Sequence, residues 1–197
     1  HFIARRSAGS VVRVLNPRLD EHGWESTHTV IEIVGDDMPF LVDSVTMEIN
    51  RQGLTLHLII HPVLRVLRDA QGALQRLAEA GEPEVISESV MHLEVDRRTD
   101  PADIGALHAG LERALADVRA AVSDWPQMRE RLQEIISGID AIPATVDAGE
   151  RAEARAFLDW LANDNFVLLG CRDYALVSSE EGNELRIVPG SGLGLLR

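Results

Sequence analysis

Apolar and polar residues alternate along residues 29–35, and this period-two pattern predicts a β-strand with one buried face. The acidic pair Asp36 and Asp37 follows, and we expect it to cap the free N–H groups of a helix that takes Pro39 in its first turn. Gly53 can end that helix in a left-handed conformation. Between these signals, apolar residues recur at helical spacing at Leu41, Val42, Val45 and Ile49. We expect the rest of the chain to pack around this strand, turn and helix.

Four further segments have strand-like patterns, namely residues 10–15, 54–67, 73–77 and 85–97. Pro62 lies inside the second of them and donates no ladder hydrogen bond, so we expect an edge position or a bulge there. A second long helix is predicted to start at Thr99-Asp100-Pro101. Its inward positions are Ile104, Leu107, Leu111, Leu115, Val118 and Val122.

The order strand, helix, strand, strand, helix is that of a ferredoxin-like fold, which needs one more strand. Asp124-Trp125-Pro126 has the signals of another helix start, and residues 140–148 have the composition of a linker. A helix over 150–162 and strands over 166–177 and 184–188 are then expected to complete the first sheet or to begin a second module. We predict an α/β (α+β) fold with an antiparallel sheet, divided as 1–123, 124–148 and 149–197.

The composition argues against nucleic acid and membrane as partners of this chain. The 197 residues carry a formal net charge of -13, whereas binding to nucleic acid requires clustered Lys and Arg. No apolar run approaches the ~20 residues of a membrane helix. Cys171 is the only cysteine, which favours a reducing compartment and hence the cytoplasm. The chain begins without a signal-peptide pattern, and it finishes in the glycine-rich residues 189–197, which we interpret as a flexible connector. We expect a segment of a longer protein.

Histidines suggest one candidate surface. If the strands that contain His57 and His92 are antiparallel neighbours, His57, His61, His92 and Glu94 share a sheet face, and His28 and Glu32 are candidates to join them. Strand residues four apart are roughly 13 Å apart, too far to hold one ion, so we expect no metal. The alternatives are a solvated face or an interface between subunits or domains. For the interface the candidate residues are His57, Ile59, His61, His92 and Glu94.

Catalytic signals are weak throughout. Ser44 has no histidine at useful spacing, and Cys171 lies in an apolar run, where a thiol is expected to be inert. Trp125 and Trp160 occupy helical positions and are expected in the core. The glycines at 190, 192 and 194 do not make a dinucleotide-binding loop. That loop needs its third glycine at position 195, where this chain has leucine, and it also needs a following helix and a downstream acidic residue. We therefore expect no catalytic residue and no cofactor in this chain.

Three stretches carry a family resemblance: residues 23–66, GWESTHTVIEIVGDDMPFLVDSVTMEINRQGLTLHLIIHPVLRV, residues 156–176, AFLDWLANDNFVLLGCRDYAL, and residues 189–197, PGSGLGLLR. They resemble the N-terminal region of the large bacterial NAD-specific glutamate dehydrogenases. The resemblance implies an ACT-like regulatory and assembly region that precedes a distant catalytic domain. The parent enzyme would use NAD to deaminate L-glutamate oxidatively to 2-oxoglutarate.

Residues 35–45, GDDMPFLVDSV, are also similar to the ACT signature, in which a glycine follows the proline. Here Phe40 stands in that place, and a glycine would let a small ligand approach the backbone closely. The resemblance implies an amino-acid effector, other domains of the same chain and further copies as partners. Its ligand-binding candidates are Asp36, Asp37, Met38, Pro39, Phe40 and Leu41. The alternative functions are a purely structural oligomerisation module without a ligand and a self-contained enzyme.

Overall fold

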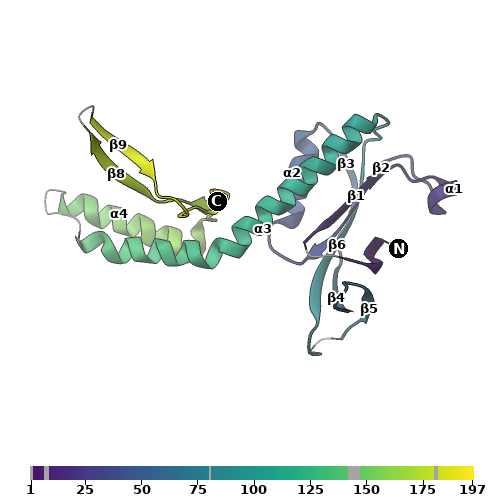
Figure 1. Cartoon of the computed structure of the whole chain (residues 1–197), viewed down its shortest axis with the longest axis horizontal. Helices are drawn as coiled ribbons and strands as arrows, with labels where there is room; N and C mark the ends of the chain where they lie inside the picture. Colours follow the sequence, from purple (N-terminus) through teal and green to yellow (C-terminus); the bar gives the residue numbers. More distant parts are fainter. Residues whose placement is uncertain (1, 7–8, 80, 142–146, 180–181) are drawn as a thin grey trace. The chain divides into compact units, whose positions relative to one another are not determined.

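The computed structural model describes residues 2–6, 9–79, 81–141, 147–179 and 182–197 (Figure 1). The chain folds as two compact units, His1–Val118 and Arg119–Arg197. The boundary falls within one helix, α3 (Pro101–Gly138), whereas the sequence placed a boundary after residue 123. No helix in the described part of the chain is both long and apolar enough to cross a bilayer.

The first unit is built on a six-stranded antiparallel sheet with the order β1-β2-β6-β4-β5, and β3 also pairs with β6. The predicted α+β class and ferredoxin-like core are confirmed. The N-terminal turn η1 (Phe2–Ala4) and the short helix α1 (Leu19–His22) flank the first strand. The strands are β1 (Val11–Leu15), β2 (Thr29–Asp36), β3 (Leu56–Ile60), β4 (Val63–Arg68), β5 (Leu74–Leu77) and β6 (Ile86–Val95).

The strand that completes the sheet comes from the N-terminal side of the core. A ferredoxin-like order of strand, helix, strand, strand, helix leaves one place free beside the first strand. β1 fills it, pairing antiparallel with β2 from Val11 opposite Val34 to Leu15 opposite Val30. The strands after residue 166, which the sequence offered for this place, lie in the second unit.

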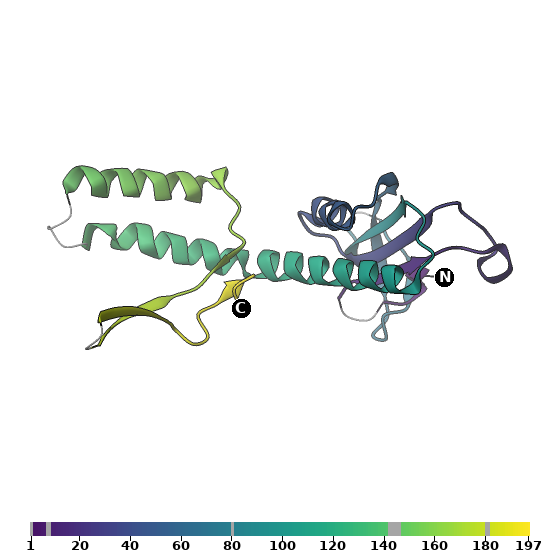
Figure 2. The same ribbon diagram turned by 90° about the horizontal axis from the view of Figure 1, so that it is seen from above.

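The core lies between one face of the sheet and two helices, α2 (Leu41–Arg51) and the first part of α3 (Figures 1 and 2). Gln52 Nε2 donates to the Ala106 carbonyl over 3.2 Å, which places the two helices side by side. Gly110 permits this approach, since a Cβ there would lie 1.9 Å from Glu48 Oε1. Fully buried side chains contribute roughly 1.5 to 3 kcal/mol each. They include Ile31, Val45, Ile49, Met91, Leu93, Leu107 and Leu111.

The single strand expected over 54–67 is two strands. β3 pairs with Glu94 and neighbouring residues near the end of β6, and β4 pairs with the beginning of β6. The break falls at His61 and Pro62, where the proline has no N–H for a ladder bond but its carbonyl accepts from Val90 N over 3.0 Å. The predicted irregularity at Pro62 is therefore confirmed as an interruption between two strands.

The second unit contains the rest of α3, followed by η2 (Ile139–Ala141), α4 (Ala148–Trp160) and the π-helical turn η3 (Leu161–Asn165). In both ribbon views α4 runs beside the end of α3 (Figures 1 and 2). Two small antiparallel sheets follow, β7 (Gly170–Cys171) with β10 (Leu193–Gly194), and β8 (Tyr174–Ser179) with β9 (Gly182–Ile187). Most of the linker predicted over 140–148 lies outside the described residues.

The predicted helix start at Asp124-Trp125-Pro126 is wrong, because α3 continues through it without a break. Asp124 does not cap a helix. Its buried carboxylate accepts from Gly194 N over 2.7 Å and from the Arg197 guanidinium, which also lowers the pKa of Asp124. The tail over 189–197 is therefore docked through β10 and this ion pair, and the flexible-connector prediction is wrong as well.

Both tryptophans predicted for the core are partly exposed. The Arg129 guanidinium lies over the Trp125 ring, 5.2 Å from its centroid. Trp160 stacks on Phe157 at a centroid distance of 6.2 Å, and both rings are about half exposed. The prediction that these two tryptophans are core residues is therefore wrong within the described residues.

Candidate functional site

The turn between β2 and α2 was the predicted ligand site. β2 ends at Asp36 and α2 begins at Leu41, so residues 37–40 form the connection. Phe40 adopts a left-handed conformation with φ 69° and precedes the helix without a side-chain cap. The predicted capping by Asp36 and Asp37 is wrong. Asp36 faces Arg6 instead, and the Asp37 backbone N–H donates to the Ser87 carbonyl over 3.0 Å.

A buried ion network adjoins this turn and was not anticipated from the sequence. Glu88 on β6 is 1% exposed, and its carboxylate accepts from Arg68 Nε and Nη2, each over 2.7 Å. Arg6 Nε lies 2.9 Å from Glu88 Oε1, and Arg6 Nη2 donates to Asp36 Oδ1 over 2.7 Å. The network therefore ties the N-terminal segment to three strands, and it occupies one of the two acidic side chains of the candidate turn. Glu88 lies near the start of β6 between two serines, so the sequence around it carried no clear signal for the network.

Asp37 borders an open cavity of about 580 Å³. The other lining residues come from β4, β5, the residue after β5, and β6: Val63, Leu64, Arg65, Leu77, Ala78 and Ser87. Of the six predicted ligand-binding residues, only Asp37 lines this cavity. Leu41 is buried in the core, and Pro39 and Phe40 are exposed on the surface. The structure thus divides the predicted set between a cavity wall, a core position and a surface turn.

The histidine face has the predicted strand pairing, with β3 antiparallel to β6. Glu94 lies between two imidazoles, with Oε2 3.1 Å from His28 Nδ1 and Oε1 3.6 Å from His92 Nε2. The His28 and His57 rings are 4.6 Å apart, and His57 Nε2 lies 2.8 Å from Asp96 Oδ1. The Thr55 backbone N–H and His57 lower the pKa of Asp96 to about 2.

Two members of the predicted set, Ile59 and His61, lie apart from this cluster. Ile59 is opposite Leu93, whose side chain is fully buried under the helices, so Ile59 faces the core and not the histidines. His61 Nε2 contacts Ser89 Oγ at 2.7 Å. The reason is a register shift between Leu56 and Leu58, which a strictly alternating pattern does not reveal. Glu32, by contrast, lies opposite His92 in the pairing of β2 with β6, and it receives a hydrogen bond of 2.6 Å from Arg13 Nε.

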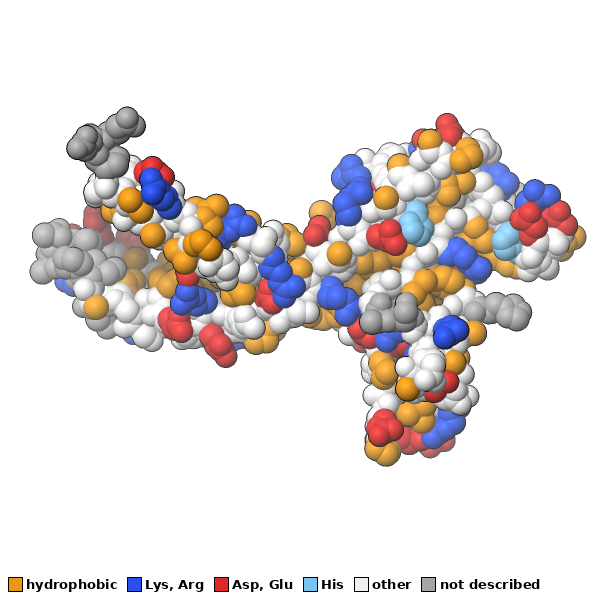
Figure 3. Space-filling model, in the orientation of Figure 1, with side chains coloured by type: hydrophobic (Ala, Val, Ile, Leu, Met, Phe, Trp, Pro, Cys, Tyr) orange, Lys and Arg blue, Asp and Glu red, His pale blue; other side chains and the backbone are white. Residues whose placement is uncertain are grey.

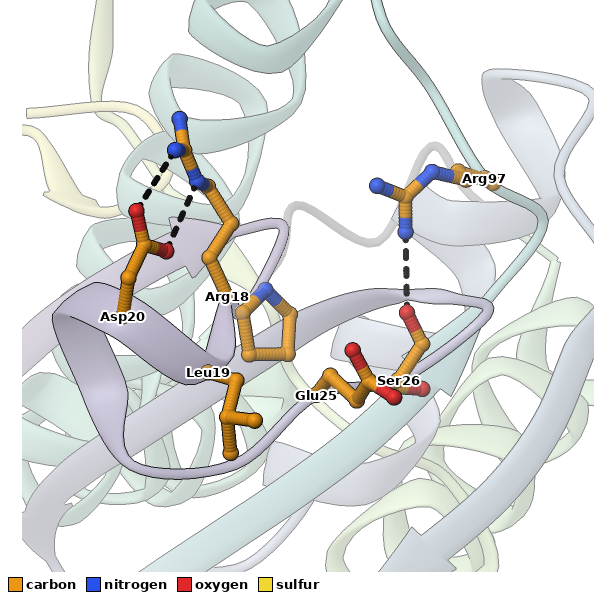
Figure 4. A pocket seen from close by; sticks show the side chains of 7 residues that line it. Arg18, Leu19, Asp20, Glu25, Ser26 and Arg97 are labelled. Atoms are coloured by element: carbon orange, nitrogen blue, oxygen red, sulfur yellow. Dashed lines mark hydrogen bonds and ion pairs between the residues drawn. The ribbon is translucent and has the colours of Figure 1, made fainter.

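Two further cavities lie on the first unit. One of about 520 Å³ is lined by residues that include Arg13, Trp24, Glu32 and His92. The other, of about 500 Å³, is shown in Figure 4. Both of its arginines already have partners, since Arg18 binds Asp20 and Arg97 donates to the Ser26 carbonyl over 2.9 Å. We therefore do not place the candidate site there.

Groups capable of chemistry are few. Among the described residues, no three His, Cys, Asp or Glu side chains are arranged to hold a metal ion. Cys171 is half-buried in β7, and burial is the main cause that raises the pKa of its thiol. A thiol in that state is a poor nucleophile at neutral pH.

Comparison with known proteins gives the family. The sequence profile described as "Glutamate dehydrogenase, ACT1 domain" matches residues 1–111, more than half of the chain. The chain belongs to this ACT1-domain family. The NAD-specific glutamate dehydrogenase of Halomonas elongata is 45% identical over 190 residues, and that of Pseudomonas aeruginosa is 37% identical over 188 residues. Each match covers 94% of this chain but only 12% of the relative. The predicted resemblance to the N-terminal region of these enzymes is confirmed.

The family assignment suggests why Phe40 has a left-handed backbone conformation. The ACT signature described above has a glycine after the proline, and a glycine adopts positive φ without strain. The chain keeps the left-handed backbone at this position with a phenylalanine, at a cost of roughly 1 to 2 kcal/mol. The side chain is exposed, so little core packing offsets the cost.

Replacing Phe40 with glycine is therefore expected to maintain the free energy of unfolding or to raise it by up to about 1 kcal/mol. Phe40→Val is the matched control, because a β-branched residue is strongly disfavoured at positive φ and should lower stability. Urea titrations followed by circular dichroism would measure both. A loss of stability in the glycine variant as large as that in the valine variant would contradict the left-handed conformation.

Proposed function

We propose that this chain is the N-terminal regulatory and assembly region of an NAD-specific glutamate dehydrogenase, and that it supplies no catalytic residue. The parent would oxidatively deaminate L-glutamate to 2-oxoglutarate with NAD. The ACT1 match over residues 1–111 carries the proposal, because it coincides closely with the compact unit His1–Val118. The names of the relatives supply the parent reaction and the coenzyme.

The turn Asp36 to Leu41 supports an amino-acid effector. The start of α2 lacks a side-chain cap, and the first N–H groups of a helix favour a carboxylate. Arg6 holds Asp36, so we assign the α-ammonium group to exposed Asp37 at the edge of the 580 Å³ cavity. The aliphatic residues Val63, Leu64 and Leu77 line that cavity and suit an apolar side chain.

Thermal-shift titration with the common amino acids tests this effector site. A ligand at 1 mM with a Kd near 0.1 mM adds roughly 1.4 kcal/mol to the free energy of unfolding, which a melting curve resolves. Asp37→Ala should abolish the shift. Asp103→Ala is the control, because Asp103 is likewise an exposed aspartate near a helix start, in the first turn of α3. If no amino acid shifts the wild type, or both variants lose the response equally, the turn is not the site.

Assembly through β3 is the second candidate function. Among the described strands, β3 pairs only with β6, so its other edge is available to another strand. Leu58 and Ile60 on β3 are exposed, and the register places them opposite Glu94 and His92 on the histidine face. An apolar edge strand of this kind is an unusual feature in a monomer.

Ile60→Lys is therefore expected to weaken self-association by at least tenfold, as measured by analytical ultracentrifugation over a range of concentrations. Ile59→Lys is the matched comparison. Since Ile59 faces the core, that variant should instead lower the melting temperature. Identical, concentration-independent sedimentation of wild type and Ile60→Lys would remove this assembly surface.

A further inference from the structure

The hairpin of β8 and β9 is amphipathic. Four apolar side chains lie on one of its faces as two cross-strand pairs, Tyr174 with Ile187 and Leu176 with Leu185. Their exposed fractions are 53% and 52% for the first pair and 66% and 67% for the second. We call these four residues the hairpin face. Cross-strand apolar pairs stabilise a sheet when another layer covers them.

The opposite face of the hairpin is suited to water. Ala175 pairs with Arg186 and Val177 with Glu184, and Arg186 Nε binds Glu184 Oε1 over 2.5 Å. The strands therefore have the alternation of a sheet with one wet and one buried side. In such a pattern the apolar side, here the hairpin face, is normally buried.

Other apolar side chains of the second unit are exposed too. They include Phe157, Trp160, Phe166 and Leu169, which come from α4 and the segment after it. Figure 3 shows hydrophobic side chains at the surface over the β8–β9 hairpin. A two-stranded hairpin alone is only marginally stable in water, so its apolar side needs a partner layer.

We propose that the hairpin face is a docking surface for a later segment of the same polypeptide, an apolar strand or helix that completes the second unit. The chain corresponds to the N-terminal region of its relatives and covers 12% of their length, so most of such a polypeptide follows it. This inference rests on the family assignment and not on the effector site.

Geometry favours a segment of the same polypeptide over a second copy. Arg172 Nε donates to the Leu196 carbonyl over 3.1 Å, and Asp173 N to Ser191 Oγ over 3.0 Å. Residues 191–196 are thus held against the two residues that precede β8, and a segment that continues from them starts beside the hairpin. A short tether gives such a segment an effective concentration in the millimolar range. A second copy would have to compete with it at its solution concentration.

Site-specific photo-crosslinking in the full-length protein tests the proposal. A benzophenone amino acid replaces Leu185 on the hairpin face, or Arg186 on the opposite face as the matched control. Mass spectrometry is expected to detect crosslinks from position 185 to peptides beyond residue 197 of the same subunit. Their yield should be at least tenfold above the yield of crosslinks from position 186. Mixing isotope-labelled with unlabelled subunits separates links within a subunit from links between copies.

Links from position 185 to another copy, links confined to residues 1–197, or equal yields at the two positions would each overturn the proposal. Amide exchange in the full-length protein gives a second readout. Leu185→Asp should speed exchange of the β8 and β9 amides at least tenfold, whereas Arg186→Ser should leave it within twofold of wild type. Unchanged exchange in Leu185→Asp would also overturn the docking. Neither measurement depends on Asp37 or on any amino acid, so a negative effector titration would leave this inference standing.

Discussion

Replacing Glu88 with alanine is expected to lower the free energy of unfolding of the first unit by about 3–5 kcal/mol. The carboxylate is 1% exposed and receives hydrogen bonds from Arg68, while Arg6 Nε lies 2.9 Å from its Oε1. Its removal leaves the buried Arg68 guanidinium without its carboxylate, and it takes away one of the two carboxylates that Arg6 contacts. Uncompensated positive charge in a buried site is far more costly than the loss of an exposed ion pair.

Glu32→Ala is the control for Glu88→Ala. Glu32 lies on the neighbouring strand and pairs with a single, partly exposed arginine, Arg13. Its loss should cost at most about 1 kcal/mol. Urea titrations of both variants, with amide exchange of β2 and β6 as a local probe, would give the two values. Equal destabilisation by the two substitutions would show that the Glu88 network is not a buried structural ion cluster.

Local sequence patterns predicted the central strand and helix of the first unit correctly. The alternation in 29–35 and the helical spacing of Leu41, Val45 and Ile49 correspond to β2 and α2, and Gly53 has the expected left-handed φ of 68°. These predictions depend only on neighbours in sequence. The partner of β2 on its outer side did not follow from the same reasoning, because β1 fills a place that the fold usually gives to a later strand.

Capping was predicted wrongly where a distant residue competes for the same side chain. Asp36 has the position of a helix cap, but Arg6, 30 residues away, binds its carboxylate. Asp124 likewise precedes Trp125-Pro126 as a cap would, yet Gly194 and Arg197 use its oxygens and α3 continues. A carboxylate that satisfies a local motif is still available to tertiary partners, and sequence spacing contains no information about them.

The candidate site shows the same limit. Pairing of β3 with β6 was predictable from two alternating segments. The sequence also predicted that His57 and His92 share one face of the sheet. The displacement of Ile59 and His61 depends on a register shift of one residue, which exchanges the two faces of a strand. The contact between His28 and Glu94 depends on the path of the chain before β2, which has no periodic pattern.

Val45→Asp in α2 is expected to unfold the first unit or to lower its free energy of unfolding by several kcal/mol. Val45 is fully buried between Leu41 and Ile49 on the face of α2 that packs on the sheet. A carboxylate at this position would lie in the core, and burying one unpaired costs several kcal/mol. The free energy of unfolding of a domain is typically about 5–15 kcal/mol, so this single substitution should remove a large part of it.

Met47→Asp provides the matched comparison, because Met47 lies two residues further along the same helix and is 71% exposed. Both variants introduce the same side chain with the same helix propensity, so the difference between them isolates burial. Met47→Asp should stay within about 0.5 kcal/mol of wild type, as is usual for surface substitutions. Circular dichroism melts would compare them. A Val45→Asp melt indistinguishable from that of Met47→Asp would mean that α2 presents a different face to the sheet, and the core around Ile31, Met91 and Leu93 would have to be reassigned with it.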